Sequence, residues 1–138
     1  MNRSGNAKMD NKILFLPVAS GEEIKEKCMI ALDENGYAVM ATKKEGLKIA
    51  GLSQQYMDNR LGGDGDRHVN VSRGAFVFEN DGTIKETDIL KECYVSAAQM
   101  VTLTSTGSSV AGIIIGVEDD GVIVDIIHSV TNKVTTGA

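Results

Sequence analysis

The chain has few aromatic residues, a single proline and no apolar run long enough to cross a membrane. Its 138 residues include no tryptophan, three tyrosines and three phenylalanines. A hydrophobic core must therefore be aliphatic, and the 42% of hydrophobic residues is enough for one ordinary domain. The longest apolar runs, such as residues 110–117, fall well short of the roughly 20 residues of a transmembrane helix. We therefore expect no contact with a membrane.

Positive charge is also scarce. The formal net charge is −5, and the longest basic run, Lys43-Lys44, is followed directly by Glu45. Proteins that bind nucleic acid usually carry a basic stripe that neutralises phosphates, so we expect no direct contact with nucleic acid. The polar N-terminus does not resemble a signal peptide. Without an export signal, Cys28 and Cys93 are expected to be free and buried rather than joined in a disulfide.

Glycine, in contrast, is abundant, and the 15 glycines indicate many tight turns between short strands. Asn35-Gly36 lies between two strand-like runs and favours a β-hairpin. A two-residue loop at that point would place Leu32 opposite Val39 and Ile30 opposite Ala41. One face of the hairpin would then be apolar, as a sheet that covers a core requires.

A second hairpin is predicted where residues 113–118 and 122–127 flank Asp119-Asp120-Gly121, because β-branched residues dominate both arms. A third turn signal, Asn80-Asp81-Gly82, follows the strand-like run 69–78. Further strand candidates are residues 13–18, 48–53, 92–96 and 100–104. Eight or nine short strands predict an all-β fold, either a small single-domain β-barrel or a β-sandwich.

Helix is expected only in short pieces. A capping-box pattern begins at Ser20, residues 53–60 could form two turns, and residues 87–92 could form one. The domain organisation that follows is an N-terminal arm over residues 1–12, a β domain over residues 13–128 and a C-terminal tail over residues 129–138. Both tails are polar and have little to bury.

The strongest candidate for chemistry is the alternation of Asp64, Asp66 and His68 after a glycine-rich loop. Two carboxylates and an imidazole could bind a divalent metal. The simpler interpretation, which we favour, is a solvated loop whose acidic residues suit the turn and whose histidine begins a strand. Gly62-Gly63-x-Gly65 lacks the Lys-Ser/Thr of a phosphate-binding loop. We therefore expect no catalytic residues, metal or cofactor, and no enzyme.

The order of the segments along residues 13–127 forms a distinctive layout. An early hairpin reads EKCMIALDENGYAVMAT (26–42), and IAGLS (49–53) follows it. A long strand with an internal glycine, HVNVSRGAFVFEN (68–80), comes after the glycine-rich loop, and AGIIIGVEDDGVIVDI (111–126) closes the domain. This layout resembles the small decoration, or capsid cement, proteins of tailed bacteriophages.

The resemblance implies a structural virion protein rather than an enzyme. Such a protein is made in the cytoplasm of the bacterial host and binds the exterior of the capsid. There it bridges neighbouring copies of the major capsid protein and stabilises the head. The resemblance also implies self-association, with a homotrimer favoured over a dimer. The acidic net charge suits an exterior position, because an inner position would face packaged DNA.

Contacts with the capsid are expected from polar segments between or beyond the strands. Such arms can order on a neighbouring subunit, and many weak contacts on a closed lattice add up through multivalency. The candidate interface residues are Arg3, Lys8, Arg60, Arg67, Asn132 and Lys133.

The alternative function is a β-barrel carbohydrate-binding or adhesion module. A sugar-binding face usually presents exposed aromatic rings. With six phenylalanines and tyrosines in the chain, and several of them needed for the core, such a face would be small. A minor tail or baseplate protein with a similar β domain is a further alternative.

Overall fold

The computed structural model describes residues 12–126 as an all-β chain, so the predicted fold class is confirmed. The single helical element is a 3-10 turn, η1 (Glu86–Asp88), and no described helix has the length and apolar character needed to cross a membrane. The twelve strands are β1 (Ile13–Pro17), β2 (Glu22–Ile24), β3 (Met29–Leu32), β4 (Ala38–Met40), β5 (Lys48–Ser53), β6 (Met57–Asn59), β7 (His68–Ser72), β8 (Ala75–Asn80), β9 (Glu92–Ala97), β10 (Met100–Thr102), β11 (Val110–Glu118) and β12 (Gly121–Asp125).

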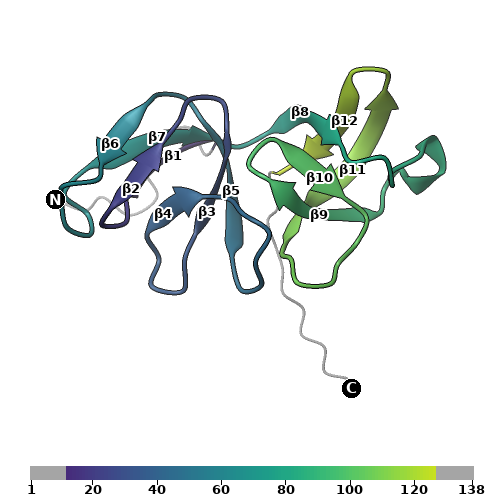
Figure 1. The fold of residues 1–138 in the computed structure, drawn as a ribbon. Helices are drawn as coiled ribbons and strands as arrows, with labels where there is room; N and C mark the ends of the chain where they lie inside the picture. The colour runs from purple at the N-terminus through teal and green to yellow at the C-terminus, as the bar shows by residue number, and fades with distance from the viewer. Residues whose placement is uncertain (1–11, 127–138) are drawn as a thin grey trace, which may run out of the picture.

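The N-terminal unit is a five-stranded antiparallel sheet in the order β1-β7-β5-β3-β4, accompanied by the two-stranded ribbon β2-β6 (Figure 1). Burial alternates along β7, whereas consecutive residues of β3 and β5 are buried, so the centre of the sheet is covered on both faces. The buried members of this unit's own core are Val18, Ile24, Ile30, Ala38, Ala50, Val69 and Val71.

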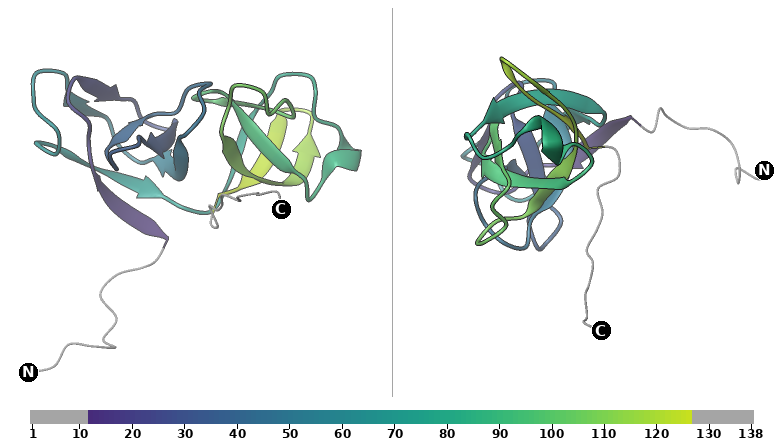
Figure 2. Two further views of the ribbon diagram at one scale, coloured as in Figure 1. Left: turned by 90° about the horizontal axis from the view of Figure 1, so that it is seen from below. Right: turned by 90° about the vertical axis from the view of Figure 1, so that its right-hand side faces the viewer.

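The C-terminal unit is a closed barrel in the order β10-β8-β12-β11-β9 (Figure 2). All its strand pairs are antiparallel except β10 with β8. The largest side chains that fill it are aliphatic, apart from Phe78, as the scarcity of aromatics requires. Closure pairs the strands on both sides, so the barrel has no open sheet edge.

The two units lie end to end, and the hydrophobic core of the barrel extends into the N-terminal unit (Figure 1). Met29, Ala31 and Ile49 of the N-terminal sheet belong to the same buried cluster as the barrel interior. The backbone N–H of Met29 also donates to the carbonyl of Ala98 at 2.8 Å. Burial and hydrogen bonding therefore fix the position of the barrel against the sheet.

The strands outnumber the eight or nine expected because β2 and β6 were not predicted as strands and because the predicted strand over residues 69–78 is divided into β7 and β8. Both β2 and β6 replace predicted helix. The stretches that begin at Ser20 and at Ser53 pair with each other, with Glu22 opposite Asn59 and Ile24 opposite Met57. A partner 33 to 37 positions away in the sequence therefore overrides the local helical signals.

The first hairpin exists, but its predicted register is wrong by one residue. Leu32 lies opposite Ala38 instead of Val39, and Ile30 lies opposite Met40. The N–H of Asp33 donates to the carbonyl of Tyr37 at 2.9 Å, so the loop between that pair has three residues. A three-residue loop that ends in a left-handed glycine is a common alternative to the two-residue turn, and Gly36 has φ +89°.

The strand-like run over residues 69–78 is divided between the two units. The chain leaves the sheet at Ser72 and enters the barrel at Ala75. Both ends of the described chain are hydrogen-bonded to the connection between the two units, Arg73-Gly74. The N–H of Arg73 donates to Lys12 O at 2.7 Å, and Ile126 N–H donates to Gly74 O at 2.8 Å. A surface hollow of about 500 Å³ lies there, lined by Lys12, Ile13, Ser72, Arg73, Gly74, Ala75 and Phe76.

Candidate interaction surfaces

The three predicted candidates for a metal site each contact a different partner. They are Asp64, Asp66 and His68. Asp64 Oδ1 accepts the N–H of Ser20 at 2.8 Å, and Asp66 Oδ2 accepts the N–H of Gly63 at 2.8 Å. His68 begins β7, and its ring stacks on Phe15 with a centroid separation of 4.8 Å. Within residues 12–126, no three acidic, histidine or cysteine side chains are grouped in a way that could hold a metal.

The loop that carries these acidic residues is anchored by Asn59, which the sequence analysis did not single out. The Asn59 side chain is 1% exposed, and its Nδ2 donates to the carbonyls of Val18, Ala19 and Gly63 at 3.0–3.1 Å. Asn59 Oδ1 has no hydrogen-bond partner among the described residues, and Gly62 packs against it. A Cβ at position 62 would stand 2.2 Å from that oxygen, which explains the glycine.

Two of the predicted interface residues lie at a second surface hollow: Arg67 lines it, and Arg60 is hydrogen-bonded to Asp58 of its lining. Arg60 Nε and Nη2 each lie 2.9 Å from Asp58 carboxylate oxygens, and these hydrogen bonds lower the pKa of Asp58 to about 2. Arg67 is exposed and also helps to lower that pKa. The hollow, of about 400 Å³, is lined by Asp58, Asn59, Leu61, Gly62, Asp66 and Arg67. The other predicted interface residues, Arg3, Lys8, Asn132 and Lys133, lie outside the described residues.

A row of apolar side chains crosses the outer wall of the barrel on three neighbouring strands. Val77 of β8 is 51% exposed and pairs with Ile123 of β12, which lies opposite Gly116 of β11. A bulge in β11 between Ile114 and Gly116 leaves Ile115 41% exposed beside them. We call Val77, Ile115 and Ile123 the barrel-wall patch. Apolar side chains that gather on a rigid surface are typical of protein interaction sites.

The loop after η1 carries another exposed apolar pair. Ile89 is 42% exposed and Leu90 is 74% exposed. Leu90 has φ +77°, a left-handed conformation that is unfavourable for a branched aliphatic residue, and its N–H donates to Ile114 O at 2.7 Å. The fold therefore holds a large apolar side chain in solvent in a strained backbone conformation.

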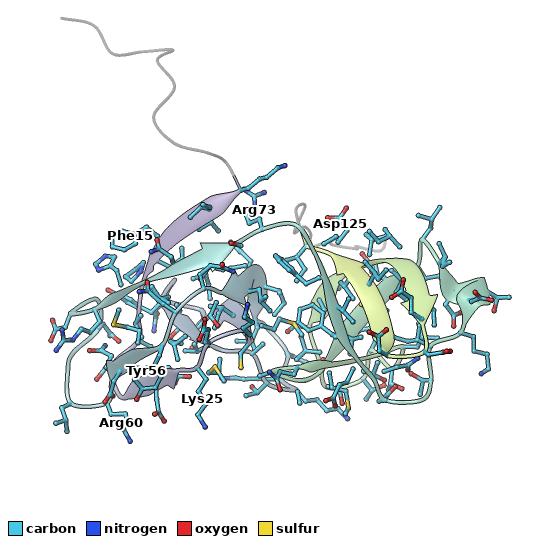
Figure 3. The ribbon with its side chains drawn as sticks, turned by 90° about the horizontal axis from the view of Figure 1, so that it is seen from above. Phe15, Lys25, Tyr56, Arg60, Arg73 and Asp125 are labelled. Atoms are coloured by element: carbon cyan, nitrogen blue, oxygen red, sulfur yellow. The ribbon has the colours of Figure 1, made fainter. Side chains whose placement is uncertain are left out.

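Edge strand β1 presents a third apolar surface. Ile13 is 42% exposed and Phe15 is 61% exposed, whereas Leu14 and Leu16 pack against the core of the N-terminal unit. Phe15 stands on the outside of the sheet (Figure 3). Its ring lies nearly parallel to that of His68, with an interplanar angle of 21°.

Both cysteines are free and buried, as predicted. Burial raises the pKa of the Cys93 thiol to about 12, and it raises the pKa of Cys28 as well. A thiol with a raised pKa carries little thiolate at neutral pH, so neither side chain is activated as a nucleophile.

No protein-family model, curated protein or solved structure matches this chain. The function therefore has to be inferred from the segment layout of the sequence and from the surfaces of the fold.

Proposed function

We propose that this chain is a structural protein of a tailed-phage virion, bound to the exterior of the capsid. In this role it contacts the major capsid protein, cements neighbouring subunits and stabilises the head without catalysing a reaction. It needs no cofactor, and it acts together with further copies of itself on the shell, as a trimer or a dimer. The segment layout of residues 13–127 supports the proposal, and so does the barrel-wall patch.

The observation that carries the proposal is the placement of Val77 and Ile115 on the closed barrel. Every strand of the barrel is paired on both sides, so its wall can meet a partner through side chains without rearranging the backbone. Burying apolar surface contributes about 25 cal/mol per Å². Two half-exposed side chains therefore supply a weak contact in each copy, and a weak contact suits a lattice on which many copies bind together.

The opposite end of the molecule offers a polar contact of different character. Arg60 and Arg67 are exposed at a loop that Asn59 holds in place, and Leu61 protrudes fully between them. A protein with an apolar surface at one end and a charged loop at the other can bridge two subunits. The polar residues Arg3, Lys8, Asn132 and Lys133 belong to this proposal as additional contacts.

The test is co-sedimentation of the purified chain with undecorated capsids of the parent phage. We expect saturable binding with a fixed number of copies per capsid protein. Val77→Lys combined with Ile115→Lys should weaken that binding, because it places charge in the barrel-wall patch. Thr106→Lys, on an exposed loop of the same unit, is the matched control and should bind like the wild type. Wild-type chain that stays in the supernatant at all concentrations contradicts the proposal.

The alternative of a carbohydrate-binding or adhesion module has one supporting observation. Phe15 and Tyr56 are 61% and 50% exposed on the N-terminal unit, so aromatic rings are available for stacking on sugars. A glycan array tests this function. Binding that Phe15→Ala or Tyr56→Ala abolishes would favour it over the capsid role.

A further inference from the structure

Strand β1 forms one edge of the five-stranded sheet, and within residues 12–126 no strand pairs with its outer side. We propose that β1 of one copy pairs antiparallel with β1 of a second copy, so that two five-stranded sheets become one continuous sheet across a two-fold axis. This self-pairing surface is independent of the capsid role, and it would hold for a protein with any other function.

The hydrogen bonds between β1 and β7 determine which backbone groups face outward. Antiparallel pairs alternate between hydrogen-bonded and non-hydrogen-bonded positions. Arg73 N–H donates to Lys12 O and Val18 N–H donates to Arg67 O, so the even-numbered residues of β1 are the ones bonded to β7. The N–H and C=O groups of Ile13 and Phe15 therefore point away from the sheet, toward a neighbouring strand.

The composition of β1 favours pairing. Edge strands that must stay single usually carry charged residues or proline, whereas ILFLP contains no charge and has its one proline at the last position. The other edge of the sheet, β4, is covered, because Val18 bridges to Ala38 and the Met40 N–H donates to Glu22 Oε2 at 2.8 Å. The fold thus covers one edge of this sheet and leaves an apolar strand on the other.

A two-fold axis through Phe15 gives every outward N–H group of β1 a carbonyl partner in the second copy, and it leaves only the outward carbonyl of Ile13 without a donor from the neighbouring strand. Phe15 then lies opposite Phe15 of the second copy, and the two residues exchange two N–H···O bonds. Ile13 lies opposite Pro17, which lacks an N–H but offers the carbonyl that Ile13 N–H requires. Lys12 lies opposite Val18, so the register places no like charges across from each other. This self-complementarity is what a two-fold interface requires.

The side chains add contact on the same surface. Phe15 is exposed in the monomer and would meet the same residue across the axis, an aromatic pair of the kind that stabilises neighbouring strands. His68 already stacks on Phe15, which limits the motion of the ring before pairing. The interface is small, so we expect a reversible dimer whose population depends on concentration.

Sedimentation equilibrium over a range of concentrations tests the proposal. The expected result is a monomer–dimer equilibrium between 14.7 kDa and twice that mass. Phe15→Lys and Phe15→Glu each place like charges across the two-fold axis, so each should weaken dimerisation at least about tenfold. Mixing the two variants should restore association, because lysine then faces glutamate.

Control variants distinguish pairing through β1 from association through other parts of the chain. Thr106→Lys lies on an exposed loop of the barrel and should leave dimerisation unchanged. Deletion of residues 127–138 should also leave it unchanged, and a loss there would overturn the proposal by assigning the dimer contact to that segment. Four further results overturn the proposal: a monomer at every concentration, a trimer, a dimer that Phe15→Lys does not weaken, and a failure of the mixed variants to associate. Circular dichroism establishes that each variant is folded.

Discussion

The hydroxyl of Ser109, the residue before barrel strand β11, donates a 2.6 Å hydrogen bond to the backbone carbonyl of Lys44 in the N-terminal unit. The same oxygen accepts the N–H of Leu47 at 3.0 Å. One side chain therefore satisfies two backbone groups of the other unit and ties the 44–47 loop to the barrel. Ser109 is 7% exposed, so water cannot easily replace it.

Ser109→Ala should accordingly destabilise the protein by about 1 kcal/mol, because it leaves two partly buried backbone groups without their hydrogen-bond partner. Urea unfolding followed by circular dichroism measures the change. Thr106 is exposed in the segment between β10 and β11 that also contains Ser109. Thr106→Ala should therefore shift the free energy of unfolding by no more than about 0.5 kcal/mol. Equal effects of the two substitutions would argue against this tie between the units.

Gly62→Ala should destabilise the loop that presents Arg60 and Arg67. Its Cβ would lie 2.2 Å from Asn59 Oδ1, and Asn59 cannot move without releasing three carbonyls. We expect a loss of about 1–3 kcal/mol in the free energy of unfolding, as for other overpacked sites. Gly63→Ala is the matched control, since its Cβ would meet nothing closer than 3.6 Å. A tolerated Gly62→Ala would contradict this packing.

Leu90→Gly should stabilise the protein by about 0.5–1 kcal/mol, because glycine adopts φ +77° without the steric cost that leucine bears. Little burial is lost, since Leu90 is 74% exposed. Ile89→Gly, at a residue with φ −58°, should destabilise the protein instead. Thermal unfolding compares the two variants. A lower midpoint for Leu90→Gly would show that its side chain contributes to folding.

The pH dependence of stability should contain a contribution from Asp58. The hydrogen bonds from Arg60 lower the pKa of Asp58 to about 2, against an ordinary carboxyl value of 3.8 in the unfolded chain. A lowered carboxyl pKa stabilises the folded state above pH 3.8, and the contribution disappears as the pH falls from 3.8 toward 2. The difference in thermal midpoint between wild type and Asp58→Asn should therefore vanish over that interval. A difference that persists at pH 2 would assign it to another cause.

The sequence predicted the all-β class and the second hairpin because their signals are local. The predicted β-branched arms do pair, although Gly121, which was expected in the turn, begins β12 opposite Glu118. The register of the first hairpin was missed because Asn35-Gly36 is compatible with two loop lengths. Only the backbone hydrogen bond from Asp33 N–H to Tyr37 O distinguishes the three-residue loop from the two-residue loop.

Other features depend on contacts that are distant in sequence. Arg73-Gly74 interrupts a run that reads as one strand, and the division follows from which unit each half packs against. Asn59 is buried because carbonyls from two other segments surround its amide, which a glycine-rich loop alone does not indicate. The exposure of Phe15 likewise depends on β1 lying at an edge.

Cryo-electron microscopy of undecorated capsids mixed with this chain tests the proposed function most directly. The proposal predicts ordered density for the chain at symmetry-related sites on the capsid exterior, with the barrel-wall patch or the Arg60–Arg67 loop against the major capsid protein. Capsids of the parent phage that remain bare at saturating concentrations of folded chain would contradict it.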